Sequence, residues 1–98
     1  MTNYRRGVET ERKIMAILEE AGYEVFRTAQ SRGPFDVGGI GPNSVRFIQS
    51  KRSKEPTGWE SEFEQAMEIL RKLPKIPSVS YECWVWVDRK GFIKREVV

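Results

Sequence analysis

The chain has 98 residues, a formal net charge of +3, one cysteine and no histidine. This length fits a single domain spanning residues 1–98, and one cysteine excludes an internal disulfide framework. The absence of histidine excludes histidine-based triads and most zinc sites, so any metal must be held by oxygen, which favours Mg²⁺ or Mn²⁺. No signal peptide or membrane span is recognisable, and we expect a cytoplasmic protein.

The sequence predicts two helices and five strands in the order α-β-β-β-α-β-β. Gly22 ends the first helix, residues 28–34 form a polar loop, and a capping-box pattern of Thr57 with Glu60 opens the second helix. This order indicates an α/β fold with a mixed central sheet and flanking helices. The predicted elements cover residues 6–21, 23–27, 35–40, 44–52, 57–73, 80–88 and 91–97.

Glu11 departs from the apolar pattern of the first helix. At about 100° per residue it falls in the middle of the face that the apolar residues define. A carboxylate in an apolar interface is costly unless a cation or a donor meets it. We therefore expect Glu11 to meet Lys51 or a bound metal, or else an arginine in a purely structural ion pair. The predicted face consists of Val8, Ile14, Met15, Leu18 and Ala21.

Two short apolar runs joined by a turn bring an acid, an amide and an ammonium together. Asp36 starts one strand, and hairpin pairing places it close to Gln49 and Lys51, which share one face of the next strand. Gly38 and Gly39 leave room for a backbone or a ligand to approach. Such a set can hold a divalent metal against a phosphate, although a strand fraying into a charged loop gives the same pattern.

Basic residues flank this region of the sequence. Such a stripe suits a phosphate backbone, and a solvated surface explains it equally well. The cluster contains Arg5, Arg6, Arg12, Lys13, Arg27, Arg32, Lys51, Arg52 and Lys54.

Four segments match the pattern of a known family. They are Arg6-Gly7-x-x-x-Glu11-Arg12, Gly22-Tyr23-x-Val25-x-Arg27, Ser31-Arg32-Gly33-Pro34-Phe35-Asp36-Val37 and Ile48-Gln49-Ser50-Lys51. In these segments the chain resembles the PD-(D/E)XK nuclease superfamily and, within it, the archaeal-type Holliday junction resolvases. The resemblance covers residues 5–54 well and the rest of the chain in element order only.

The resemblance implies a restriction-endonuclease-like fold and metal-dependent cleavage of DNA at Glu11, Asp36, Gln49 and Lys51. Asp36, the Gln49 oxygen and the Ser50 carbonyl would hold Mg²⁺ or Mn²⁺, with Glu11 helping directly or through water. Lys51 would position the attacking water or stabilise charge on the phosphate. The implied DNA contacts are Arg5, Arg6, Arg27, Ser31, Arg32, Arg52 and Lys54.

Gln49 departs from the family pattern, which has glutamate or aspartate at this position. A glutamine still offers a neutral oxygen, but it removes one negative charge and should weaken the binding of Mg²⁺. We interpret it as a tolerated variant. A weak or manganese-preferring enzyme and a retired active site remain open.

A four-way junction is cut on two strands, so a resolvase needs two active sites related by a two-fold axis, and we expect a homodimer. Strand 80–88 is apolar on both faces, with Trp84 and Trp86 on one of them. That pattern indicates burial against a second subunit, unless the second helix covers the tryptophan face. The alternatives to a resolvase are a general or repair-type endonuclease of the same fold, a non-catalytic DNA-binding module, and an RNA-binding protein.

Overall fold

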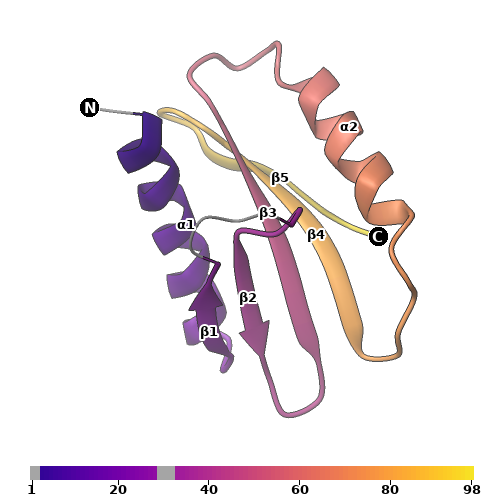
Figure 1. Cartoon of the computed structure of the whole chain (residues 1–98). Coiled ribbons are helices and arrows are strands. Elements are labelled where there is room, and N and C mark those ends of the chain that lie inside the picture. The colour runs from indigo at the N-terminus through magenta and orange to yellow at the C-terminus, as the bar shows by residue number, and fades with distance from the viewer. Residues whose placement is uncertain (1–2, 29–32) are drawn as a thin grey trace.

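Two helices enclose one five-stranded sheet (Figure 1). The computed structural model describes residues 3–28 and 33–98, and for residues 3–6 it describes the backbone alone. The predicted order of elements is confirmed, and with it the α/β class. The elements are α1 (Asn3–Glu20), β1 (Glu24–Arg27), β2 (Val37–Ile40), β3 (Val45–Ser53), α2 (Glu60–Arg71), β4 (Val79–Val87) and β5 (Gly91–Val97).

The strands lie in the order β1-β2-β3-β4-β5, and only the β3–β4 pair is parallel. Parallel neighbours need a long crossover, which α2 supplies between β3 and β4. Tight turns connect two of the antiparallel pairs. Gly41 N donates to Ser44 O at 2.8 Å between β2 and β3, and Lys90 N donates to Val87 O at 3.0 Å between β4 and β5. None of the described helices is long and apolar enough to cross a membrane.

Helix α1 ends as its sequence predicts. Gly22 has a φ of 94°, a left-handed conformation that favours glycine. Gly22 N donates to Glu19 O and Tyr23 N donates to Leu18 O, each at 3.0 Å, which is the pairing of a Schellman cap.

The buried face of α1 is turned away from its predicted centre. Thr10, Ile14 and Leu18 are fully buried, whereas Ala21 is exposed and Glu11 is half-buried at the margin. The prediction that Glu11 lies in the middle of the buried face, and that Ala21 belongs to it, is therefore wrong. The centre of the buried face is displaced because Thr10 belongs to it. A prediction from the spacing of apolar residues alone does not include a threonine.

Helix α2 begins at Glu60, three residues after its predicted start. Gly58 has a φ of 91°, so the chain passes through a left-handed turn that no continuous helix from Thr57 can contain. Glu60 Oε1 accepts a hydrogen bond from Gly58 N at 2.8 Å, while Trp59 occupies the N-cap without a side-chain cap. The predicted capping box of Thr57 with Glu60 is therefore wrong.

Each face of the sheet carries its own core. On one face α2 packs against β4, and on the other α1 packs against β1, β2 and β3. The first core consists of Phe63, Ala66, Met67, Leu70, Tyr81, Cys83, Val85 and Val87, and the second of Ile14, Leu18, Val37, Ile48 and Trp84.

The tryptophan face of β4 lies under α1. Trp84 is 1% exposed within the single chain and packs with Ile14, Leu18 and Ile48. The prediction that the second helix covers the tryptophan face is therefore wrong, and Trp84 needs no second subunit to be buried. The two faces were misassigned because period 2 shows which residues share a face but not which helix covers it. On the opposite face, burial raises the pKa of the Cys83 thiol to about 11, as expected for a structural cysteine.

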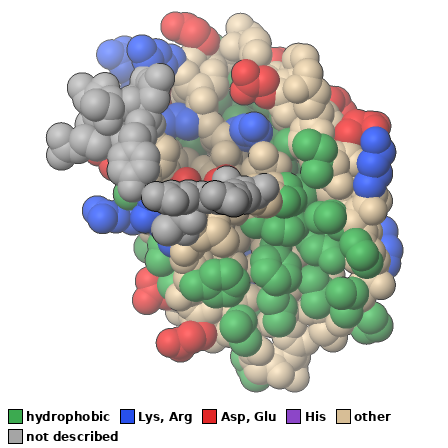
Figure 2. Space-filling view, in the orientation of Figure 1, with side chains coloured by type: hydrophobic (Ala, Val, Ile, Leu, Met, Phe, Trp, Pro, Cys, Tyr) green, Lys and Arg blue, Asp and Glu red, His purple; other side chains and the backbone are tan. Residues whose placement is uncertain are grey.

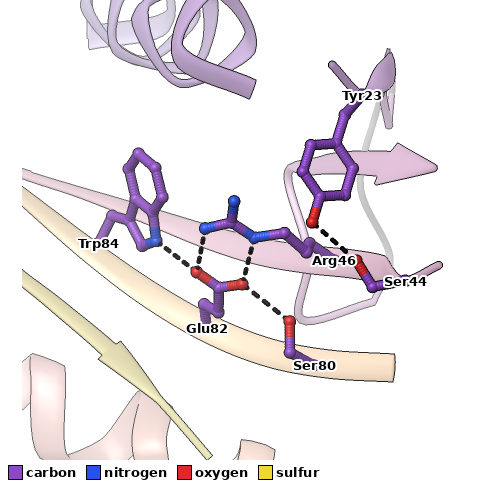
Figure 3. Close-up of polar contacts among 6 residues, drawn as sticks. All are labelled: Tyr23, Ser44, Arg46, Ser80, Glu82 and Trp84. Carbon is purple, nitrogen blue, oxygen red and sulfur yellow. Dashed lines mark hydrogen bonds and ion pairs between the residues drawn. The ribbon is translucent and has the colours of Figure 1, made fainter. Parts of the chain in front are cut away.

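A buried ion pair lies on the α1 side of the sheet, away from the predicted site (Figure 3). Glu82 is 2% exposed, and its carboxylate accepts hydrogen bonds from Arg46 Nε at 2.8 Å and Nη2 at 2.9 Å. Ser80 Oγ at 2.8 Å and Trp84 Nε1 at 2.9 Å complete its hydrogen bonds. Four donors thus meet one buried carboxylate, as burial of a charge requires.

One part of the sheet is left uncovered by α2. On the α2 face of β1, β2 and β3, Phe26 crosses Gly38, where a Cβ atom would lie 2.1 Å from the Phe26 ring. The room predicted at Gly38 is thus taken by an aromatic ring, not by a ligand. We define the aromatic face as the connected rings of Phe26, Phe47, Phe35 and Tyr81. Phe26 keeps 37% of its surface exposed, and Figure 2 shows a continuous apolar patch on this side of the molecule.

Candidate active site

Asp36 is held against β3 by its backbone and its side chain. Asp36 N donates to Ile48 O at 2.9 Å, and Asp36 Oδ2 accepts a hydrogen bond from Ser50 N at 2.8 Å. Val37 also pairs with Ile48, so two consecutive residues lie against one residue of β3, as in a β-bulge. Bulges redirect a side chain and are common beside active sites. This local irregularity fixes the Asp36 carboxylate beside Ser50, the residue between Gln49 and Lys51, to which the sequence predicts that Asp36 lies close.

Gln49 and Lys51 follow on the same strand. Alternation along β3 places both on the face of Phe47, and Gln49 lies beside Cys83 of β4. Gln49 Oε1 is buried and has no hydrogen-bond partner among the residues that the structure describes. Buried polar atoms are nearly always paired, so an orphaned amide oxygen requires an explanation. A buried amide oxygen of this kind has the chemistry of a metal ligand.

The Ser50 carbonyl belongs to the same edge of β3. In an antiparallel pair the N–H and C=O of one residue point to the same neighbour. The Ser50 N–H points to Asp36, and its carbonyl is therefore directed to that side as well. Three kinds of oxygen therefore lie at this part of β3: the carboxylate of Asp36, the side-chain amide of Gln49 and the backbone carbonyl of Ser50.

The surroundings of Asp36 compensate its negative charge only in part. Burial raises its pKa, the hydrogen bond from Ser50 opposes the rise, and the nearby charge of Glu11 adds to it. Lys51 and Arg27 lower the pKa of Asp36, but they leave it above its ordinary value. Two neighbouring carboxylates with too little compensating charge are stabilised by a bound cation.

Glu11 forms an ion pair with an arginine. Arg27 Nε donates to Glu11 Oε1 at 2.6 Å, with the two side chains 28% and 16% exposed. Of the partners anticipated for Glu11, the structure therefore gives the arginine and not Lys51. Helix α1 covers the face of β3 that contains Ile48, whereas Lys51 belongs to the opposite face, which separates the pair. Glu11 remains close enough to Asp36 to affect its pKa.

The residues predicted to contact DNA fall into three groups. Arg27 is bonded to Glu11, and Arg52 lies between Asp88, at 2.9 Å, and Glu9, at 3.5 Å. Lys54 is exposed beyond the end of β3. The remaining residues lie outside the described side chains, and they are Arg5, Arg6, Ser31 and Arg32.

The described residues hold no cluster of three or more histidine, cysteine, aspartate or glutamate side chains able to bind a metal. A metal site at Asp36 would therefore combine its carboxylate with other oxygen donors, and the amide oxygen of Gln49 and the carbonyl of Ser50 are available on β3. These residues fit a hard divalent ion because oxygen donors are what Mg²⁺ and Mn²⁺ prefer, and because Gln49 Oε1 has no other partner among the described residues.

Two polar features are missed by the sequence patterns alone. Arg46 and Glu82 both occupy inward positions of predicted strands, and a search for opposite charges on the buried face of neighbouring strands would have paired them. Arg89 and Lys90 lie in the β4–β5 turn, where their sequence indicates only a turn. The close approach of that turn to the end of β3 is visible only in the folded chain.

Comparison with known proteins gives one family and one fold. The family model described as archaeal Holliday junction resolvase (Hjc) matches residues 2–71. Among solved structures, the chain is similar to Hjc of Archaeoglobus fulgidus, a Holliday junction resolvase from an archaeal hyperthermophile. That match has a TM-score of 0.60 and 21% identity, and it covers 89% of this chain and 69% of the other. No curated protein matches the chain.

Proposed function

Because the chain belongs to the family of archaeal Holliday junction resolvases, which are nucleases, we propose that it cuts four-way DNA junctions at the site around Asp36, Gln49 and Lys51. The observation that carries this assignment is the buried, unpartnered Gln49 Oε1 on the strand that also holds Asp36. An unpaired buried oxygen does not stabilise a core, whereas in a metal site it can serve as a ligand.

The metal proposed here is Mg²⁺ or Mn²⁺, held by Asp36, Gln49 Oε1 and the Ser50 carbonyl. When bound, a divalent ion at such a site supplies Lewis acidity toward a phosphate and lowers the pKa of a bound water. The protein contributes the placement of these oxygens. The Ser50 amide fixes one oxygen of Asp36, and the pairing of β3 with β4 fixes the backbone of Gln49 beside Cys83.

Lys51 is the proposed catalytic cation. It lies two residues after Gln49 on the same face of β3, and its charge lowers the pKa of Asp36. From there its ammonium can position the attacking water and stabilise charge that grows on the phosphate. Glu11 acts on the metal site indirectly, because its carboxylate accepts a hydrogen bond from Arg27. It holds that arginine at the site, and its negative charge beside Asp36 adds to the attraction for a cation, by charge alone or through a water.

The DNA contacts proposed from the sequence surround this site. Phosphate contacts position a duplex without reading its sequence, which suits an enzyme that recognises a branched shape. We place the enzyme in the cytoplasm with its DNA. The proposed contacts are Arg5, Arg6, Arg27, Ser31, Arg32, Arg52 and Lys54.

A homodimer supplies the two cuts that a junction requires. The apolar residues of β4 do not support it, since both faces of β4 are covered within one chain. The aromatic face supports it instead. Phe26 and Phe47 are in ring contact and Phe26 is exposed, and apolar side chains can meet their own copies across a two-fold axis without like charges facing each other. Phe35 belongs to this face and directly precedes Asp36, so such a dimer would tie subunit pairing to the active site.

The test uses a labelled four-way junction and a matched linear duplex, each in Mg²⁺ and in Mn²⁺. We expect paired, symmetric nicks on the junction alone. Lys51→Ala and Asp36→Asn should lower the rate by at least about 10²-fold and leave DNA binding intact. Asp36→Asn keeps an oxygen for the Ser50 amide, so its loss of activity is not a loss of fold. Lys75→Ala, an exposed lysine near α2, is the matched control.

Each other result has a definite meaning. Retained cleavage in Lys51→Ala or Asp36→Asn contradicts the assignment of the site. Cleavage of both substrates by the wild type indicates a general nuclease. Junction binding without cleavage in either metal indicates a retired site, the alternative that Gln49 in place of an acid favours.

A further inference from the structure

A basic pocket lies where β3 ends beside the β4–β5 turn. Its volume is about 550 Å³. Figure 1 places this turn at the end of the sheet where β3 leaves toward α2. The lining residues are Lys54, Glu55, Pro56, Asp88, Arg89 and Lys90. Residues 72–98 lie beyond the segment matched by the family model, so nothing in that match assigns a role to the turn.

The pocket has a fixed backbone. Asp88 N donates to Ser53 O at 3.0 Å, which ties the turn to the end of β3, and Lys90 N donates to Val87 O at 3.0 Å. Arg89 adopts a φ of 70°, which is uncommon for a residue other than glycine and sets the direction of its side chain.

Arg52 braces the turn from inside the sheet. Its Nε lies 2.9 Å from Asp88 Oδ1, and its Nη1 lies 3.5 Å from Glu9 Oε2 on α1. The Arg52 side chain is only 20% exposed. Arg52 thus connects α1, β3 and the turn, and it engages the charge of Asp88. Its geometry is that of a positioning residue.

The pocket is left with excess positive charge. Once Asp88 is engaged by Arg52, Glu55 is the single other acid that lines it, against Lys54, Arg89 and Lys90. In the described part of the chain none of these three cations forms an ion pair. Like charges held together repel each other, and an anion that binds between them relieves the repulsion.

The pocket also lies next to the catalytic strand. Lys54 follows Lys51 by three residues and comes directly after Ser53, the last residue of β3. Every nucleotide of a DNA strand carries a backbone phosphate, so a strand held at Lys51 continues with further phosphates beside the cut.

We propose that this pocket binds backbone phosphates of a junction arm beside the cut. Lys54, Arg89 and Lys90 make the contacts, and Arg52 with Asp88 positions the turn. The inference rests on the proposed function and adds Arg89 and Lys90 to the residues that act on DNA. It also changes the role of Arg52 from DNA contact to support.

The experiment measures junction binding by fluorescence anisotropy without divalent metal, over a range of salt concentrations. The double variant Arg89→Gln/Lys90→Gln should bind roughly tenfold more weakly near 100 mM salt, and its salt slope should fall by about 0.9 for each phosphate that the variant no longer neutralises. Lys72→Gln/Lys75→Gln removes the same charge near the end of α2 and should stay within about twofold of the wild type. In cleavage assays, the enzyme concentration for half-maximal rate should rise by a similar factor for the Arg89/Lys90 variant, because the loss is in binding.

Asp88→Asn separates positioning from simple charge. Removing an acid beside DNA should tighten binding if only net charge matters. If Asp88 holds the turn through Arg52, the same change should weaken binding severalfold. Tighter binding by Asp88→Asn overturns the positioning role.

Wild-type affinity and salt slope in Arg89→Gln/Lys90→Gln overturn the subsite. If the wild type itself neither binds nor cuts the junction, the proposed function fails instead. The two failures are therefore distinguishable.

Discussion

Removing Arg46 should destabilise the protein through the carboxylate that it leaves behind. Arg46→Met keeps most of the side-chain volume but deletes two of the four hydrogen bonds to Glu82, those from Nε and Nη2. The bonds from Ser80 and Trp84 remain. Glu82, at 2% exposed, then keeps its charge without a cation.

The magnitude follows from this burial. Removing one partner of a buried ion pair costs about 3–5 kcal/mol. Arg46 is 25% exposed in its side chain, so water can reach the site and the lower end applies, about 3 kcal/mol. For a domain of this size that is a large part of a total stability of roughly 5–15 kcal/mol. The melting temperature should fall on the order of 15 °C.

The pH dependence has a definite sign. Burial alone raises the pKa of Glu82, but hydrogen bonds from Arg46, Trp84 and Ser80 outweigh it and hold the pKa below its ordinary value of 4.5. The wild type therefore has the full stability from this group above the unfolded pKa and loses it as the pH falls through the folded pKa. Without Arg46, burial raises the pKa of Glu82, so its carboxylate takes up a proton more readily and the uncompensated charge disappears. The loss of unfolding free energy of the variant relative to the wild type should therefore be smaller at pH 4 than at pH 7.

Urea unfolding followed by tryptophan fluorescence measures this effect at both pH values. Arg71→Met is the control, because Arg71 pairs with Glu64 at the surface at 3.4 Å and should contribute less than about 1 kcal/mol. Arg46→Met/Glu82→Gln should recover part of the loss, since it removes the uncompensated charge. If Arg46→Met loses less than about 1 kcal/mol of unfolding free energy at pH 7, or loses as much at pH 4 as at pH 7, the reasoning is refuted.

Two further predictions concern the active site and the dimer. Gln49→Glu adds a carboxylate to the proposed ligands and should lower the Mg²⁺ concentration for half-maximal cleavage on the order of tenfold. An unchanged Mg²⁺ dependence, as expected for the exposed control Gln65→Glu, would remove Gln49 from the ligand set. Phe26→Glu should halve the mass measured by light scattering at micromolar concentration, whereas Ile93→Glu, similarly exposed on β5, should not. A wild type that is already monomeric excludes the dimer.

The order of elements and the register of the central hairpin were predictable because they depend on local periodicity. Alternation in residues 44–52 and the turn before them bring Asp36 to this part of β3, and in the structure its carboxylate accepts a hydrogen bond of 2.8 Å from Ser50 N. The left-handed cap at Gly22 is local for the same reason. The start of α2 was missed because Gly58 turns the chain between the two residues of an apparent capping box.

The partners of buried charges depended on tertiary structure. Glu11 was recognised as needing a partner, but its pairing with Arg27 depends on how α1 lies across β1, which no spacing within the helix reveals. Trp84 lies under α1 because α2 crosses over to the other face of the sheet.

The sequence by itself determined the fold class, the family and the few polar residues of the candidate site. Each of these depends on residue types at short spacing along one or two elements. Only the tertiary structure decided which charges meet, that Gln49 Oε1 is buried without a partner among the described residues, and that the β4–β5 turn closes a basic pocket beside β3. Those facts depend on packing between segments far apart in the chain, where the geometry of the whole sheet sets the distances.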